Sequence, residues 1–166
     1  MHESFLPPIR ALGADTASSA RELAQSSLAG TPYAEHILAT LDDAATAPGR
    51  ESRALVMQSG DSEEILGVVV FGEVAGTVGT GKLHFVGVAA SARPQGVASR
   101  LIDAAIADLV ANKARFVVAE LPDGPRTKAA HELLLSNKFI EDVRIPDFYA
   151  DGVALVCFRR EIPSGM

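Results

Sequence analysis

Apolar residues recur along this chain with two different periods, and the period changes several times. Short apolar runs typical of strands alternate with stretches in which apolar residues return every three or four positions, as on one face of a helix. The pattern predicts seven strands, at 9–12, 54–58, 65–71, 83–89, 116–121, 139–145 and 153–160, and four helices, at 16–29, 32–46, 97–110 and 127–137.

The order of these elements, β-α-α-β-β-β-α-β-α-β-β, predicts the fold class. Successive strands joined by turns favour antiparallel hairpins, and the later β-α-β-α unit favours a crossover. We therefore expect an α/β (α+β) fold, with a mixed, mostly antiparallel sheet of six to seven strands flanked by about four helices. The length of 166 residues suits a single domain over residues 1–166. Loops are expected at 72–81, which contains four glycines, and at 146–152, which joins the last two strands.

Composition and charge argue against several classes of protein. The chain is 48% hydrophobic and 22% charged, which is typical of a packed globular core. Its net charge of -6, without a basic stripe, argues against nucleic-acid binding. No apolar run approaches the roughly 18 residues of a membrane helix, and the N-terminal stretch lacks the features of a secretory signal. We therefore expect no membrane contact and a cytoplasmic location. The spacing of His and Cys residues does not indicate a metal site, so we expect none.

The strand–turn–helix over residues 83–110 carries the most chemical information. The first N–H groups of a helix lack internal partners and carry partial positive charge, so they bind anions when the preceding turn allows close approach. Gly96 places no side chain where phosphate oxygens would approach, and Ala98 is small. Arg93 adds a cation and Ser99 a hydroxyl. The pattern favours a phosphate site, although a tight strand–helix connection could use the same residues.

The sequence Arg93-Pro94-Gln95-Gly96-Val97-Ala98 resembles the acetyl-CoA signature of the GNAT acetyltransferase family, Arg/Gln-x-x-Gly-x-Gly/Ala. The resemblance in element order extends from about Ile9 to Ile162. It implies acetyl-CoA as co-substrate, a strand before the turn that splays away from its neighbour and pairs with the pantetheine arm, and a turn that wraps the pyrophosphate. The residues expected to bind acetyl-CoA on this basis are Val86, Gly87, Val88, Arg93, Pro94, Gln95, Gly96, Val97, Ala98, Ser99 and Thr127.

Acetyl transfer to an amine requires a base that removes a proton from the amine. His84 is one candidate, because an unperturbed histidine titrates near pH 6.5. Arylalkylamine acetyltransferases of the GNAT family place a strand histidine at the same offset from the signature. Glu120 ends a predicted strand where other members have a catalytic glutamate, and it would need burial to raise its pKa. A histidine without a role and a solvated carboxylate are the alternatives at these two positions.

An acid that protonates the leaving thiolate is harder to assign. The usual acid of the family is a tyrosine, and the corresponding position holds Leu134, while Lys138 replaces the glycine that follows. Tyr149 lies in the predicted 146–152 loop, a region that often helps form the acceptor site of the family. It is a candidate for the substrate site and for the acid. A reaction without an acid is the alternative, because a thiolate is already a tolerable leaving group.

Residues 76–83, Gly-Thr-Val-Gly-Thr-Gly-Lys-Leu, nearly match the Walker A loop of nucleotide-binding proteins. They lack the final Ser/Thr, and a strand is expected where a helix should follow, so we interpret them as a glycine-rich hairpin loop.

The expected function is acetyl-CoA-dependent N-acetyl transfer to a primary amine of a small molecule or a protein, by direct attack. The alternative is a non-catalytic acyl-CoA-binding GNAT-like domain that serves as a sensor or an interaction module. A homodimer is expected from the family resemblance alone.

Overall fold

Seven strands form one mixed sheet in the computed structural model, which describes residues 5–163. Their order is β1-β2-β3-β4-β5-β7-β6, and every neighbouring pair is antiparallel except β4 and β5. The strands are β1 (Ile9–Ala11), β2 (Arg53–Gln58), β3 (Ile65–Glu73), β4 (Thr80–Val88), β5 (Phe116–Pro122), β6 (Ile140–Ala150) and β7 (Val153–Glu161). The helices are α1 (Ala17–Leu28), α2 (Ala34–Thr46), α3 (Val97–Ala111) and α4 (Lys128–Ser136), with short 3-10 turns η1 (Ala90–Ala92) and η2 (Pro125–Thr127).

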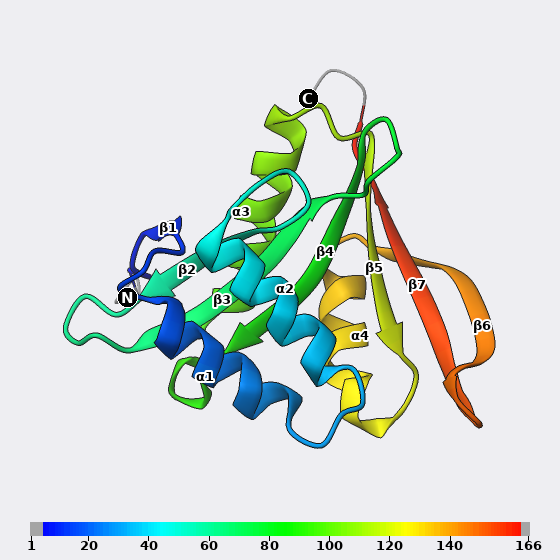
Figure 1. Ribbon diagram of the computed structural model, residues 1–166, viewed down its shortest axis with the longest axis horizontal. Coiled ribbons are helices and arrows are strands. Elements are labelled where there is room, and N and C mark those ends of the chain that lie inside the picture. Colours follow the sequence, from blue (N-terminus) through cyan, green and yellow to red (C-terminus); the bar gives the residue numbers. More distant parts are fainter. Residues whose placement is uncertain (1–4, 164–166) are drawn as a thin grey trace.

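Helices cover both faces of the sheet, which gives three layers (Figure 1). Helices α1 and α2 lie on one face, and α3 and α4 lie on the other. Strand β3 is buried on both faces, which explains its nearly continuous apolar sequence. The core on the α1–α2 face includes Ala20, Ala24, Leu41, Val56, Val68 and Val70. The core on the α3–α4 face includes Met57, Val69, Phe71, Leu101, Leu109, Leu134 and Phe158. The predicted fold class is confirmed.

Gly67 allows α3 to lie close against β3. A Cβ atom at this position would stand 2.8 Å from Val97 Cγ1 and 2.7 Å from Leu101 Cδ1, closer than carbon atoms can approach. Since Val97 is the first residue of α3, this glycine sets the distance between the sheet and the beginning of that helix.

The 146–152 segment was predicted to be a loop, and this prediction is wrong for most of it. Strand β6 continues to Ala150 and leaves only a two-residue turn before β7. The register shifts between Ile145 and Ala150, and Asp147 has a φ of 55° and accepts a 2.7 Å hydrogen bond from the Gly152 N–H. A strand can contain Pro146 here because β6 is the edge strand, where proline is tolerated.

The glycine-rich segment forms a hairpin loop as expected, but the loop spans 74–79 rather than the predicted 72–81, because both flanking strands extend into it. It joins β3 to β4, which begins at Thr80, so a strand rather than a helix follows the Walker-like sequence. Within residues 5–163, no helix combines the length and the apolar character needed to cross a membrane.

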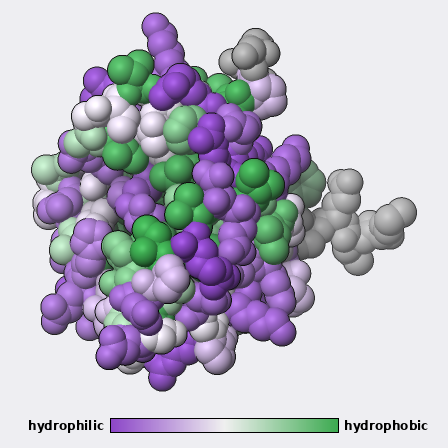
Figure 2. All heavy atoms as spheres, turned by 90° about the vertical axis from the view of Figure 1, so that its right-hand side faces the viewer, coloured by the Kyte–Doolittle hydropathy of each residue, from purple (hydrophilic) through white to green (hydrophobic). Residues whose placement is uncertain are grey.

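The edge strand β6 exposes several apolar side chains. Figure 2 views the molecule from the side on which β6 lies, and hydrophobic residues interrupt the polar surface there. The exposed apolar residues of β6 are Ile140, Val143, Ile145 and Phe148.

Candidate active site

Strands β4 and β5 pair over only three residues each. Thr80–Lys82 of β4 pairs with Phe116–Val118 of β5, and the pairing stops there. Beyond Lys82, β4 continues along β3, whereas β5 continues along β7. The two central strands therefore separate in a V, as the family resemblance implied.

A cleft of about 220 Å³ opens at this V. Its walls come from β4, β5 and β6, from the ends of α1 and α2 that face each other, and from α3, η2 and α4. It brings together the three predicted catalytic residues, His84, Glu120 and Tyr149. Leu134, at the usual tyrosine position, also lines it. Five charged or aromatic lining residues were not predicted from the sequence: Tyr33, His36, Lys82, Phe85 and Arg126.

His84 is the extra residue of a β-bulge in β4. Val70 pairs with Phe85 and Phe71 pairs with Leu83, so His84 has no direct partner on β3. A bulge of this kind redirects a side chain. The bulge explains why the polar ring of His84 lines the cleft, although its neighbours Leu83 and Phe85 pack against the two hydrophobic cores on opposite faces of the sheet.

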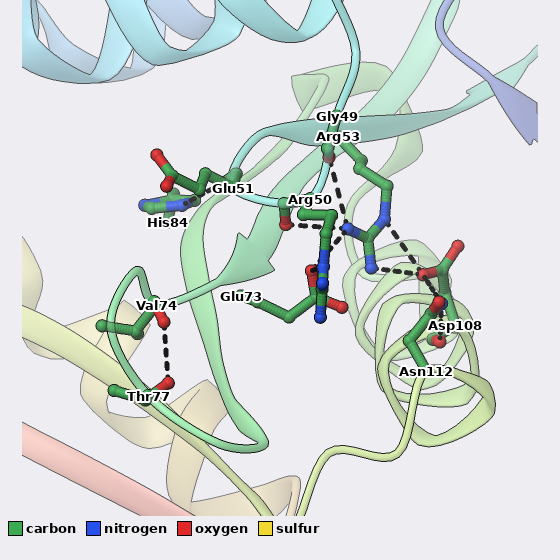
Figure 3. Close-up of polar contacts among 10 residues, drawn as sticks. All are labelled: Gly49, Arg50, Glu51, Arg53, Glu73, Val74, Thr77, His84, Asp108 and Asn112. Carbon is green, nitrogen blue, oxygen red and sulfur yellow. Dashed lines mark hydrogen bonds and ion pairs between the residues drawn. The ribbon is translucent and has the colours of Figure 1, made fainter.

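The ring of His84 has a defined hydrogen-bond partner (Figure 3). Its Nε2 lies 3.1 Å from the backbone carbonyl oxygen of Glu51. A carbonyl oxygen can only accept, so Nε2 carries the hydrogen, and Nδ1 keeps a lone pair in the neutral ring. Burial lowers the pKa of His84 below the ordinary histidine value, which favours this neutral form at pH 7.

The Glu51 carbonyl belongs to a segment that is held firmly across the end of β3. The neighbouring Arg50 carbonyl accepts hydrogen bonds from the Glu73 N–H at 2.7 Å and from Arg53 Nη1 at 2.8 Å. A Cβ on Gly72 would lie 2.1 Å from the Glu51 oxygen, so only glycine allows the segment to pass this close. The partner of His84 is therefore fixed by backbone packing.

Arg53 connects this segment to the rest of the fold (Figure 3). Its guanidinium contacts Asp108 Oδ1 of α3 at 2.7 Å and Glu73 Oε2 of β3 at 3.4 Å. It also lies 5.1 Å from the centre of the Phe71 ring. One mostly buried cation thus joins β2, β3 and α3.

Glu120 and Tyr149 have different environments. Glu120 is exposed, and its carboxylate forms an ion pair with Lys82 Nζ at 3.2 Å. The burial that would make Glu120 a base is therefore absent. Tyr149 is half-buried, and burial together with the negative charge of Glu120 raises its pKa, so the phenol stays protonated at neutral pH. Its ring lies 6.3 Å from that of Tyr33.

The turn before α3 leaves the beginning of this helix open. Gly96 is the N-cap residue with a φ of 81°, and a Cβ there would meet nothing within 4 Å. A φ in this range favours glycine. Pro94 and Gln95 are exposed beside it. An open glycine therefore precedes α3, the arrangement in which the first N–H groups of a helix can bind an anion.

Arg93 is less free than the sequence suggested. Its Nε and Nη2 donate to the Val88 carbonyl at 3.0 and 2.7 Å. The guanidinium therefore closes the end of β4, in addition to any charge that it offers to a ligand.

The backbone of β4 offers alternating groups to the V. The Ala89 N–H donates to the Leu66 carbonyl of β3 at 2.9 Å. The backbone N–H and C=O groups of successive residues in a strand point to alternate sides, so Gly87, two positions before Ala89, also points its N–H and C=O toward β3. Val86 and Val88 therefore point theirs toward the V, where Arg93 already occupies the Val88 carbonyl and leaves the Val88 N–H. This alternation favours Val86 and Val88 over Gly87 as backbone partners for a ligand.

Two predicted ligand-binding hydroxyls already have protein partners. Thr127 is buried, and its Oγ1 lies 2.5 Å from the Pro122 carbonyl oxygen, to which it donates. Ser99 Oγ accepts from Asn137 Nδ2 at 3.2 Å. Among residues 5–163, no three His, Cys, Asp or Glu side chains gather in the manner of a metal site.

The missed cleft residues differ in how far the sequence could have revealed them. Lys82 lies two positions before His84 on the same strand, so strand periodicity could have indicated it, despite the bulge. Arg126 adjoins Thr127, at a position that the resemblance had already highlighted. The Glu51 carbonyl carries no sequence signal, because every residue offers a backbone carbonyl.

Comparison with known proteins is consistent with this geometry. The family model described as "Acetyltransferase (GNAT) family" matches residues 20–134. A solved structure from Desulfovibrio desulfuricans, described as a GNAT-family acetyltransferase, is 18% identical with a TM-score of 0.84, and the match covers 94% of this chain and 99% of that chain. No curated protein matches the chain in sequence.

Two further solved structures share the fold but act on different acceptors. An aminoglycoside 6'-N-acetyltransferase complexed with coenzyme A is 12% identical with a TM-score of 0.75, covering 96% of this chain and 99% of that chain. A ribosomal-protein-alanine N-acetyltransferase from Brucella melitensis is 16% identical with a TM-score of 0.73, covering 93% and 99%. The family match over more than half of the chain shows that this protein belongs to the GNAT family of acetyltransferases.

Proposed function

We propose that this acetyltransferase uses acetyl-CoA to acetylate a primary amine, by direct attack of the amine in the cleft between β4 and β5. The observation that carries the proposal is the position of His84, a histidine with a lowered pKa that lines the V beside unpaired backbone groups of β4. The similar aminoglycoside 6'-N-acetyltransferase was solved with coenzyme A, which supports the choice of donor.

The residues around the V fit such a donor. The open helix terminus after Gly96 would hold the pyrophosphate, and the backbone of Val86 and Val88 would pair with the pantetheine arm. Acetyl-CoA supplies an activated acetyl thioester. An N–H of β4 that faces the V would polarise the acetyl carbonyl in the manner of an oxyanion hole.

His84 would prepare the acceptor. Its Nδ1, free of the Glu51 contact, accepts a proton from the acceptor ammonium, directly or through water. The neutral amine then forms the C–N bond as the C–S bond breaks, and the proton that the nitrogen loses replaces the one that the thiolate receives. Tyr149 is protonated at neutral pH and can give its proton to the thiolate, whereas Leu134 cannot. Lys82 keeps Glu120 paired, so we assign the base to His84 rather than to Glu120.

The test has two stages. Calorimetric titration should show that acetyl-CoA binds, and thiol detection across a panel of primary amines should show CoA release. His84→Ala should bind acetyl-CoA like the wild type and lose turnover. Binding without CoA release for any amine would instead support a non-catalytic acyl-CoA sensor. Undiminished turnover in His84→Ala would remove His84 from the mechanism. The homodimer stays a prediction, which sedimentation velocity tests.

A further inference from the structure

The charged side chains of the cleft do not balance. Lys82, Glu120 and Arg126 are the charged residues that line it. Lys82 and Glu120 neutralise each other in their 3.2 Å ion pair. Arg126 has no carboxylate within ion-pair distance among residues 5–163. A chain with a net charge of -6 therefore keeps an excess positive charge in its cleft.

The position of Arg126 is built into the fold. Arg126 lies in η2, after β5, yet its Nη1 donates to the Ala29 carbonyl at 3.2 Å, 97 residues away, in the connection between α1 and α2. Gly30, with a φ of 77°, makes room for it, because a Cβ there would lie 2.7 Å from Nη1. Only this one hydrogen bond engages the guanidinium among the described residues, so its other donors can bind a ligand.

Arg126 has different neighbours from the turn predicted for the pyrophosphate. It contacts the α1–α2 connection, and these helices cover one face of the sheet. The Gly96 turn leads into α3 on the opposite face, where Val97 joins the second core. An anion held by Arg126 is therefore better explained as part of the acceptor than as a phosphate of the donor.

Two tyrosines line the cleft together with Arg126. The Tyr33 and Tyr149 rings are 6.3 Å apart and tilted by 51°, and both line the cleft. Tyr33 is the N-cap residue of α2, three positions after Gly30, which lies against the Arg126 guanidinium.

We propose that the acceptor is a small primary amine that also carries an anionic group, such as a carboxylate, and that Arg126 binds this group. The inference rests on the proposed function. The amine lies near His84, the body of the molecule contacts the two tyrosine rings, and the anion forms charge-assisted hydrogen bonds with the guanidinium. The same charge disfavours polycationic acceptors of the aminoglycoside type, because the one carboxylate within residues 5–163 that lines the cleft is already paired.

The experiment compares three pairs of acceptors, each sharing one body with and without a carboxylate: phenylalanine and 2-phenylethylamine, leucine and 3-methylbutylamine, glycine and methylamine. The wild type should prefer the carboxylate in at least one pair by about tenfold or more in kcat/KM, the ratio that one charge-assisted hydrogen bond supplies. Arg126→Gln should lose the preference, with an unchanged KM for acetyl-CoA. Arg126→Lys should keep part of it. Lys128→Gln, which removes an exposed charge outside the cleft lining, is the matched control and should keep it fully.

A second readout does not depend on turnover. Calorimetric titration of the N-acetyl products of the same pairs should show tighter binding of the carboxylate form, and Arg126→Gln should remove the difference. Carboxylate-dependent binding without CoA release would support the anion site and count against the proposed function. Equal use of both members of every pair, a change confined to the KM of acetyl-CoA, or no binding of any product would overturn the inference.

Discussion

Replacing Arg53 by methionine tests how the fold holds the partner of His84. Methionine keeps much of the apolar stem and removes the guanidinium. The side chain is only 20% exposed, and it contacts Asp108 at 2.7 Å, Glu73 at 3.4 Å and the Arg50 carbonyl at 2.8 Å. The substitution would leave Glu73, whose side chain is 12% exposed, with only the Arg50 guanidinium at 3.3 Å.

The magnitude follows from these contacts. A hydrogen bond to a charged group contributes about 1.5–3 kcal/mol, and breaking a fully buried ion pair costs about 3–5 kcal/mol. Asp108 is 34% exposed, so water compensates part of its loss. We therefore expect Arg53→Met to lower the free energy of unfolding by about 2–3 kcal/mol. The turnover number should also fall, because the Glu51 carbonyl that orients His84 belongs to the loosened segment.

Urea denaturation of the wild type and Arg53→Met measures this difference in the free energy of unfolding, provided that the two proteins have equal m-values. Arg50→Met is the matched control, since Arg50 is 86% exposed and contacts the same Glu73 oxygen at 3.3 Å. Exposed pairs contribute little, and the control should change stability by less than about 1 kcal/mol. Equal stability losses in the two variants would refute the reasoning that burial makes Arg53 the important cation.

Three further predictions concern His84 in the cleft and two glycines near the beginning of α3. The kcat/KM of the wild type should fall with decreasing pH only below the ordinary histidine range, because the lowered pKa keeps His84 neutral to lower pH. His84→Gln should lower kcat about 100-fold and abolish this acidic fall in kcat/KM. If the variant kept the acidic fall, His84 would be excluded as its origin. Gly67→Ala should destabilise the protein by about 1–3 kcal/mol in urea titrations, because Val97 and Leu101 must move, and unchanged stability would contradict the close approach of α3. Gly96→Ala should raise the Kd for acetyl-CoA about tenfold in calorimetry while costing roughly 1–2 kcal/mol of stability, and an unchanged Kd would place the pyrophosphate elsewhere.

Periodicity predicted the elements well where one side of each element is buried. Helix α3 was predicted at 97–110 and runs over Val97–Ala111, and β3 was predicted at 65–71 and runs over Ile65–Glu73. The prediction was wrong at 146–152, where Pro146 and Gly152 indicated a loop. An edge strand with almost every residue exposed leaves no burial pattern, so local turn chemistry was the only signal there.

The sequence by itself determined the class of fold, the strand–turn–helix with its open glycine, and the family resemblance. These depend on local spacing, which the chain displays directly. Only the tertiary structure decided which groups meet in the cleft. The Lys82–Glu120 pair, the bulge at His84, and the reach of Arg126 to Ala29 depend on strand register and helix packing. Contacts between residues as far as 97 positions apart are set by the three-dimensional path of the backbone, and the spacing of residues along the sequence does not reveal this path.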